Sequence, residues 1–305
     1  WNGTGTGSVV GGDQAVPNSS FFGVIDTAGF PKDSYYFYSS QWVEDKTTLH
    51  VVPQSWNEED LTISSGKVPV YIYSNAAKVE LYLNDVKIGT ATRNDFETDA
   101  GYTYSTYTNT SDNAELCTAV NENQEWKRMA AQFSVQYEEG TLSAKAYDSN
   151  GELIEDTYGL DYVTTNSDEG SSLKVTAEKS EIQADGSSLS YISVDVLDGN
   201  GEFVSSARNN IRFSLTGNGE IVGVDNGNPS TTDKFQQPSV LTSEKSANID
   251  AFSGKALVIV RSTDKAGGFT LRAESSGLKG GAVNVGTVGD EQGPAYVKDY
   301  EITKE

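Results

Sequence analysis

The stretch VPVYIYSNAAKVELYLNDVKIGT, residues 68–90, decides the fold class of this chain. Apolar side chains alternate with other side chains over residues 68–74, 78–83 and 86–90, which is the two-residue period of a half-buried β-strand. Asn84-Asp85 separates the last two runs and predicts a tight turn, because both residue types tolerate turn conformations. The stretch therefore predicts three short strands, two of them joined by a hairpin.

The same pattern recurs on both sides of this stretch. Short strands with turn signals every 8–12 residues are typical of β-sandwiches. Residues 166–172 have the composition of a linker, so we expect one sandwich over residues 46–166 and a second, immunoglobulin-like one over residues 171–290. Residues 92–125 are polar and irregular and predict a long surface loop. Residues 291–305 predict a linker or the start of a further module. The other predicted strands are residues 47–52, 129–137, 141–147, 152–158, 173–177, 189–197, 211–215, 220–224, 255–261 and 268–273.

Two strings of the form Asp-x-Asn-Gly-Glu, starting at Asp148 and Asp198, separate predicted strands. Each resembles the first half of a calcium loop, but the twelfth residue of each string is Gly159 or Asn209 rather than the glutamate that such a loop needs. The strings therefore predict hairpin turns, in which glycine takes a positive φ angle at little cost.

The N-terminal region follows another pattern. Glycines predict a loop over residues 1–20, and Pro31 predicts the first turn of a helix over residues 34–42. Tyr35, Tyr38 and Trp42 fall on one face of that helix, and an aromatic stripe of this kind usually packs against a core. Trp1 is followed by neither a basic nor an apolar segment, so the start is not a signal peptide, and we expect the chain to be a piece of a larger protein.

Composition excludes several classes of function. The 305 residues hold 22 Lys and Arg against 44 Asp and Glu, a net charge of −22, which disfavours nucleic acid and anionic membranes as partners. No apolar run is long enough to insert into a membrane. One Cys and one His exclude an internal disulfide and a multi-histidine metal site, so we expect no metal and no cofactor. An acidic chain with so little sulfur fits a secreted or cell-surface bacterial protein.

Three groups of motifs together resemble the family-2 glycoside hydrolases of the β-galactosidase type. SSFFGVIDTAGFPKDSYY (residues 19–36) resembles the end of their catalytic (β/α)8 barrel, and LHVVPQSW (residues 49–56) with residues 68–75 and 79–84 resembles the β-sandwich after it. GNGEIVGVDNGNP (residues 217–229), with residues 184–192 and 251–260, resembles the immunoglobulin-like module that follows. The resemblance implies a mainly β fold, in which two β-sandwich domains follow the last strand-loop-helix segment of a barrel, residues 1–45.

The resemblance also implies a function. The parent protein is expected to be a secreted hydrolase, a retaining β-galactosidase that acts on terminal β-galactosides. Retaining glycosidases use two carboxylates, which this family places on earlier barrel strands, so we expect no catalytic residue in this chain and no activity of the chain alone. Its partners would be the N-terminal catalytic part of the same enzyme and the β-galactoside substrate. The resemblance leaves open whether the enzyme forms an oligomer. Ser19, Ser20 and Phe21 are the residues expected nearest to substrate.

Two other classes of function stay open. The chain is a carbohydrate-binding or adhesion module if its aromatic rings stack on sugar rings. The candidates for this role are Trp126, Tyr104 and Tyr107, and also Tyr71, Tyr73 and Tyr102. Alternatively, the sandwiches are purely structural spacers or interface domains.

The remaining reactive residue types predict structural roles. We interpret His50 as a hydrogen-bonded histidine at a domain junction and Cys117 as an inert thiol. The adjacent carboxylates Glu58-Glu59 and Glu138-Glu139 are expected to be solvated, because neighbouring residues of a strand point to opposite faces.

Overall fold

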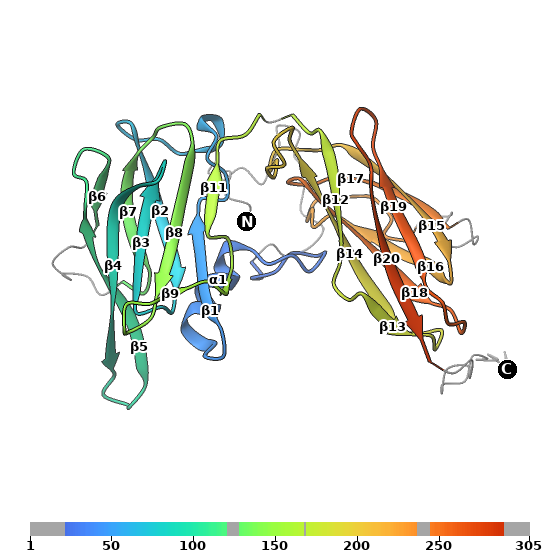
Figure 1. Ribbon diagram of the computed structural model, residues 1–305, viewed down its shortest axis with the longest axis horizontal. Coiled ribbons are helices and arrows are strands. Elements are labelled where there is room, and N and C mark those ends of the chain that lie inside the picture. Colours follow the sequence, from blue (N-terminus) through green and yellow to red (C-terminus); the bar gives the residue numbers. More distant parts are fainter. Residues whose placement is uncertain (1–21, 121–127, 168, 237–244, 290–305) are drawn as a thin grey trace. The chain divides into compact units, whose positions relative to one another are not determined.

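The computed structural model describes residues 22–120, 128–167, 169–236 and 245–289, and it is mainly β, as predicted. The chain divides into two compact units: apart from short N-terminal stretches, the first extends to Asn166 and the second begins at Ser167 (Figure 1). Each unit is a sandwich of two sheets with its own apolar core.

The first unit contains an α-helix, a 3-10 helix and eleven strands within the described residues. Its first sheet has the strand order β10-β1-β2-β7-β6, and its second has the order β11-β8-β3-β4-β5, with β9 paired to β8. The elements are α1 (Asp33–Trp42), β1 (Thr47–Val52), η1 (Glu58–Asp60), β2 (Lys67–Ser74), β3 (Lys78–Leu83), β4 (Val86–Glu97), β5 (Thr103–Ser111), β6 (Cys117–Ala119), β7 (Ala131–Gln136), β8 (Thr141–Tyr147), β9 (Leu153–Ile154), β10 (Thr157–Tyr158) and β11 (Tyr162–Thr164).

The core of the first unit lies between its two sheets. Alternation along β2 buries Val68, Val70 and Ile72 in this core and leaves Tyr71 and Tyr73 on the other face, as the two-residue period requires. Trp56 and Phe133 are the bulkiest apolar side chains of the core and are almost completely buried.

The predicted turn at Asn84-Asp85 is confirmed and joins β3 to β4. Both residues have positive φ angles, 49° and 64°, which match the right-handed twist of a two-residue hairpin. The Asn84 side chain also accepts a hydrogen bond from the Thr141 amide (2.9 Å). It lies so close to Gly140 that a Cβ atom there would overlap it, so this strand junction requires glycine at residue 140.

The predicted loop over residues 92–125 is wrong for most of its length. β4 continues to Glu97 and pairs with β5 in nine consecutive antiparallel positions, from Gly89–Ser111 to Glu97–Thr103 (Figure 1). The sequence hides this strand because the buried positions of β5 carry polar groups, including Ser105 and Asn109, rather than apolar side chains.

The second unit contains nine strands within the described residues. Its sheets have the orders β12-β14-β18-β16 and β13-β20-β19-β15-β17. The core between them includes Ile192, Phe213, Val258 and Leu271, all fully buried. The strands are β12 (Ser172–Ala177), β13 (Glu181–Gln183), β14 (Leu189–Leu197), β15 (Asn210–Gly217), β16 (Gly219–Asp225), β17 (Ser246–Asp250), β18 (Lys255–Ser262), β19 (Phe269–Glu274) and β20 (Gly281–Val288).

Both Asp-x-Asn-Gly-Glu strings form turns, as predicted. The Oδ1 atom of Asp148 accepts hydrogen bonds from the amides of Asn150 (2.9 Å) and Glu152 (2.8 Å). Asp198 accepts the equivalent pair in the second unit, at 2.8 and 2.9 Å. These carboxylates therefore satisfy backbone donors of their own turns.

Helix α1 begins at Asp33, with Lys32 as its N-cap residue. Pro31 does not lie in the first turn of the helix as predicted: it precedes the N-cap and forms a β-bridge with Ile25. The helix packs on β1 and β2 of the first unit. It has 10 residues, and no helix in the described part of the chain has the length and apolar character that crossing a bilayer requires.

Candidate functional site

Helix α1 packs on the outer face of the first sheet, and a group of hydrogen bonds at this junction surrounds His50. His50 on β1 is 1% exposed, and its Nδ1 accepts a hydrogen bond from the Leu160 amide (3.2 Å). Nε2 therefore carries the proton in the neutral ring and donates it to Asp33 Oδ1 (2.8 Å) in the first turn of α1. The same carboxylate oxygen accepts from Gln54 Nε2 (2.6 Å). His50 is thus a hydrogen-bonded structural histidine, as predicted.

Aromatic rings cover this junction. Tyr36 of α1 stacks on the His50 ring at a centroid distance of 3.9 Å, and Phe37 contacts Tyr73 edge-on at 5.5 Å. Burial raises the pKa of Tyr36 and of Tyr73 to about 12, and the negative charge of Asp33 adds to both shifts. Both hydroxyl groups therefore stay protonated at neutral pH.

The C-terminal end of α1 is held through Asn75, just after β2. Its side-chain oxygen accepts from the Thr48 amide (2.8 Å), and its Nδ2 donates to the carbonyls of Val43 and Lys46, both at 3.0 Å. Arg93 of β4 donates to the Asn75 carbonyl (2.6 Å). These bonds attach both ends of the helix to the sandwich and fix the position of the side chains along its length.

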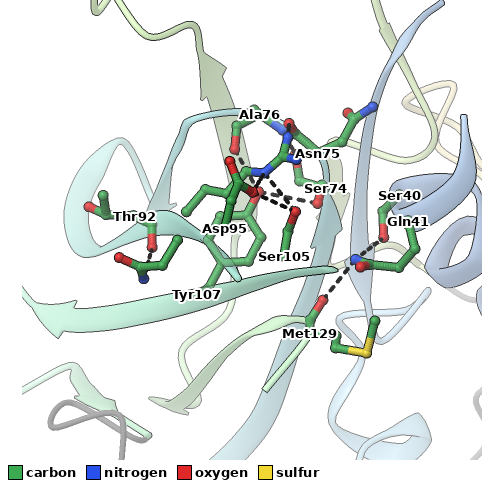
Figure 2. A network of polar contacts seen from close by, with 12 residues as sticks. Ser40, Gln41, Ser74, Asn75, Ala76, Thr92, Asp95, Ser105, Tyr107 and Met129 are labelled. Atoms are coloured by element: carbon green, nitrogen blue, oxygen red, sulfur yellow. Dashed lines mark hydrogen bonds and ion pairs between the residues drawn. The ribbon is translucent and has the colours of Figure 1, made fainter. Parts of the chain in front are cut away.

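Tyr107 lies inside the sandwich beside Asn75, so the expectation that it stacks on a sugar is wrong. Its ring is fully buried, and its hydroxyl donates to the carbonyl of Ala76 (2.7 Å) and lies 3.1 Å from that of Ser74. Figure 2 shows these residues together with Asp95 and Ser105. Tyr107 therefore ties β5 to the end of β2 and presents no face to a ligand.

A pocket opens where the edge of α1 meets β2 and β7. Its volume is about 640 Å³, inside the usual range for small-molecule sites, about 300–1,000 Å³. Aromatic rings, two cationic side chains and an amide line it: the residues are Lys32, Asp33, Ser34, Phe37, Tyr38, Tyr71, Tyr73, Arg128, Met129, Ala130 and Gln132.

The polar groups of this pocket form a chain across its wall. Arg128 Nη1 donates to Gln132 Oε1 (2.7 Å), and Gln132 Nε2 donates to the Tyr71 hydroxyl oxygen (3.1 Å). Sequence reasoning named Tyr71 and Tyr73 but missed Arg128 and Gln132. The alternation of β7 was a usable signal for Gln132, since it places that residue on the same outer face as Tyr71.

Of the other sequence-predicted sugar contacts, Tyr102 and Tyr104 do not line this pocket. Ser19, Ser20, Phe21 and Trp126 lie outside the described residues, so their expected roles stay predictions. Tyr104 lies on β5, half-buried, with its ring stacked on Phe96 at a centroid distance of 5.7 Å. Tyr102, 74% exposed, lies in the turn that joins β4 to β5.

The adjacent glutamate pairs singled out in the sequence are exposed, and one further glutamate is buried among cations. Glu58, Glu59, Glu138 and Glu139 are exposed, as expected. Glu80 on β3 is buried, and it binds Lys78 Nζ (3.0 Å), Lys87 Nζ (3.1 Å) and the Tyr82 hydroxyl (2.7 Å). Burial acts to raise the pKa of Glu80. These hydrogen bonds and one from Tyr147 outweigh burial and lower the pKa to about 2. The carboxylate is therefore a fixed anion within a cationic cluster.

Two further observations bear on reactive groups. Burial raises the pKa of the Cys117 thiol to about 12, so it is protonated and unreactive at neutral pH, as expected. Within the described residues no group of three or more His, Cys, Asp or Glu side chains is arranged to hold a metal ion.

Family models match both units. One described as glycoside hydrolase family 2 C-terminal domain 5 matches residues 173–284, and a domain of unknown function, DUF4982, matches residues 65–155. A β-galactosidase of Bacteroides ovatus is 32% identical over 262 residues, which are 86% of this chain and 25% of that protein. A putative β-glucuronidase of Formosa agariphila is 28% identical over 207 residues, 68% of this chain and 16% of that protein. The chain thus spans a quarter or less of the length of these relatives.

Solved structures show the same arrangement of strands. A β-glycosidase from Bacteroides vulgatus is 25% identical, with a TM-score of 0.61 over 87% of this chain and 28% of its own. A glycosyl hydrolase family 2 member from Bacteroides cellulosilyticus, 22% identical with a TM-score of 0.58, covers 86% of this chain and 32% of its own, and it supports the fold alone. The ordered match of both units identifies this chain as a C-terminal region of glycoside hydrolase family 2.

Proposed function

We propose that this chain is the C-terminal accessory part of a β-galactosidase that hydrolyses terminal β-galactosides with retention. The observation that carries the proposal is the match to the Bacteroides ovatus β-galactosidase, which runs through 86% of the chain. In this proposal residues 1–45 end the catalytic barrel, and the two catalytic carboxylates belong to the N-terminal part of the enzyme. The exposed glutamates of the first unit and the cation-paired Glu80 support that placement.

The outer face of helix α1 supports an N-terminal partner. Trp42 is 74% exposed and Tyr38 is 40% exposed, and their rings pack on each other at a centroid distance of 4.7 Å. Phe22 and Ile25, which precede the helix, are exposed as well. Large aromatic groups that share one exposed face are typical of docking surfaces. We propose that the rest of the catalytic barrel covers this face, because the last helix of a barrel packs against its strands.

A complementation assay tests the proposal. The chain is mixed with the polypeptide encoded upstream of residue 1, and hydrolysis of 4-nitrophenyl β-D-galactoside is measured. We expect no turnover by the chain alone and turnover by the mixture. Trp42→Ala should weaken complementation, whereas Tyr102→Ala, which removes an equally exposed aromatic side chain elsewhere in the unit, should not. Turnover by the isolated chain would contradict the proposed absence of catalytic carboxylates.

A β-glucuronidase is the second candidate, because Formosa agariphila relatives described as a putative β-glucuronidase and as a β-glucuronidase are 28% and 25% identical to this chain. The same mixture is therefore assayed on 4-nitrophenyl β-D-glucuronide. A larger kcat/KM on the glucuronide than on the galactoside would replace the proposed substrate and leave the family unchanged.

We also propose that the parent enzyme is secreted or displayed on a bacterial surface. The support is composition alone: a net charge of −22 with one Cys and one Met. An antiserum against this chain, applied to fractions of a producing bacterium, tests it. Detection only in the cytoplasmic fraction would overturn the localisation without affecting the enzymatic proposal.

A further inference from the structure

The pocket beside α1 has the composition of a sugar site. Carbohydrate rings bind to aromatic faces through their C–H surfaces and to polar side chains through their hydroxyl groups. Phe37 and Tyr38 form the helix side of the pocket, and Tyr71 and Tyr73 form the sheet side. The rings on the sheet side are two residues apart on one strand, so they lie on the same face at a fixed spacing.

The hydroxyl group of Tyr71 is oriented as a donor. Its oxygen accepts from Gln132 Nε2, so its own proton is directed elsewhere. Gln132 is held in turn by Arg128. Tyr73 is protonated at neutral pH, since burial and the Asp33 charge raise its pKa to about 12. The sheet side thus offers neutral hydroxyl donors rather than an anion.

Charge selects the class of sugar. The chain carries a net charge of −22, yet the pocket contains two cationic side chains, Lys32 and Arg128, and one carboxylate. That carboxylate, Asp33, accepts hydrogen bonds from His50 and Gln54. Within the described residues the Arg128 guanidinium donates to the neutral amide of Gln132, which uses one of its five N–H donors. A planar guanidinium with donors to spare matches a carboxylate bidentately.

We infer that this pocket binds a uronic-acid residue of a glycan, with its carboxylate at Arg128 and its ring against Tyr71 and Tyr73. The inference goes beyond the proposed function, because the pocket lies between helix α1 and the first sheet and its binding requires no turnover. Its failure would leave the enzymatic proposal intact, and the reverse also holds.

Titration of the 305-residue chain with D-glucuronic acid, followed by NMR and calorimetry, tests the inference, with D-glucose as the neutral probe. For a ligand of this size we expect a Kd on the order of 1 mM for glucuronic acid. Binding should weaken as ionic strength rises, because salt screens the attraction between the sugar carboxylate and the exposed Arg128. Glucose should bind at least about tenfold more weakly, since it lacks the carboxylate.

Arg128→Gln should raise the Kd for glucuronic acid on the order of tenfold. The matched control is Arg272→Gln, which removes an exposed arginine from β19 of the second unit and should leave the Kd unchanged. Arg128 is itself exposed, so its replacement is compatible with folding, and far-ultraviolet circular dichroism verifies this. Equal binding of glucose and glucuronic acid, absence of binding, or equal effects of the two variants would each overturn the inference.

Discussion

Replacement of Tyr107 by phenylalanine isolates one buried hydroxyl group of the first unit. The ring keeps its size, so the variant opens no cavity in the core. What it removes is the donor to the Ala76 carbonyl (2.7 Å) and the Ser74 carbonyl (3.1 Å). Burial raises the pKa of Tyr107, so the hydroxyl is protonated and donates at all pH values at which the unit is studied.

The expected loss follows from the burial of these groups. Ser74 is 0% exposed and Ala76 is 4% exposed, so water does not replace the lost donor. A net hydrogen bond contributes about 0.5–1.5 kcal/mol, and a buried acceptor without its donor costs about 1–3 kcal/mol. We therefore expect Tyr107→Phe to lower the free energy of unfolding of the first unit by about 2 kcal/mol.

Urea unfolding followed by tryptophan fluorescence measures this loss in the first unit. All four tryptophans of the sequence, Trp1, Trp42, Trp56 and Trp126, precede residue 127, so the signal does not report on the second sandwich. With a urea dependence of about 2 kcal/mol per molar, the midpoint should fall by about 1 M.

Tyr104→Phe is the matched control on the same strand. Its ring is half-buried against Phe96 and its hydroxyl group forms no hydrogen bond within the described residues, so its midpoint should stay unchanged. Equal midpoint shifts for the two variants would refute the reasoning, because the burial of the hydroxyl would then have no consequence.

Three further predictions concern the same unit and the same urea assay. Gly89→Ala should cost about 1–3 kcal/mol, because the new Cβ would lie 2.6 Å from the Phe133 ring; an unchanged midpoint would show that the ring moves freely. Asp33→Ala should cost about 1–3 kcal/mol by removing the acceptor of the buried His50 N–H, and Asp33→Asn, which keeps an oxygen there, should cost less; equal losses would contradict this. Glu80→Gln should destabilise the unit at pH 7, and its gap to the unmodified chain should narrow between about pH 4.5 and pH 2. The folded pKa of about 2 lies below the ordinary 4.5, so the anion stabilises above that window and its contribution is lost within it; a gap independent of pH would refute the pairing.

Strands were predictable where apolar alternation and turn chemistry agree. β1, β3, β8 and β14 have the predicted bounds, and the Asn84-Asp85 turn lies where two alternating runs meet. β5 escaped prediction because its buried positions use Ser105, Tyr107 and Asn109, whose side chains form hydrogen bonds inside the sandwich. A hydrophobic period is absent from such a strand, although its β-branched and aromatic residues favour extended structure.

The pocket was only half predictable for a related reason. Spacing alone places Tyr71 and Tyr73 on one face of a strand. The approach of α1 and of Arg128 to that face depends on tertiary contacts, such as the bonds of Asn75 to Val43 and Lys46, which no local pattern contains. Likewise, Tyr104 and Tyr107 are the same residue type and have the same propensity for a strand. Only their burial in the structure distinguishes Tyr107, in the core, from the half-buried Tyr104.

A parallel strand pair in the second sandwich determines how that part of the chain responds to a pulling force. β13, near its start, pairs in parallel with β20, its last strand, through Glu181–Gly286, Ile182–Thr287 and Gln183–Val288. Tension applied to the chain between residues 180 and 289 pulls two parallel neighbours in opposite directions along their length. Their hydrogen bonds then bear the load simultaneously, in shear, instead of opening one after another as in a zipper. The β13–β20 pair is therefore the part of this sandwich that resists such a force in shear.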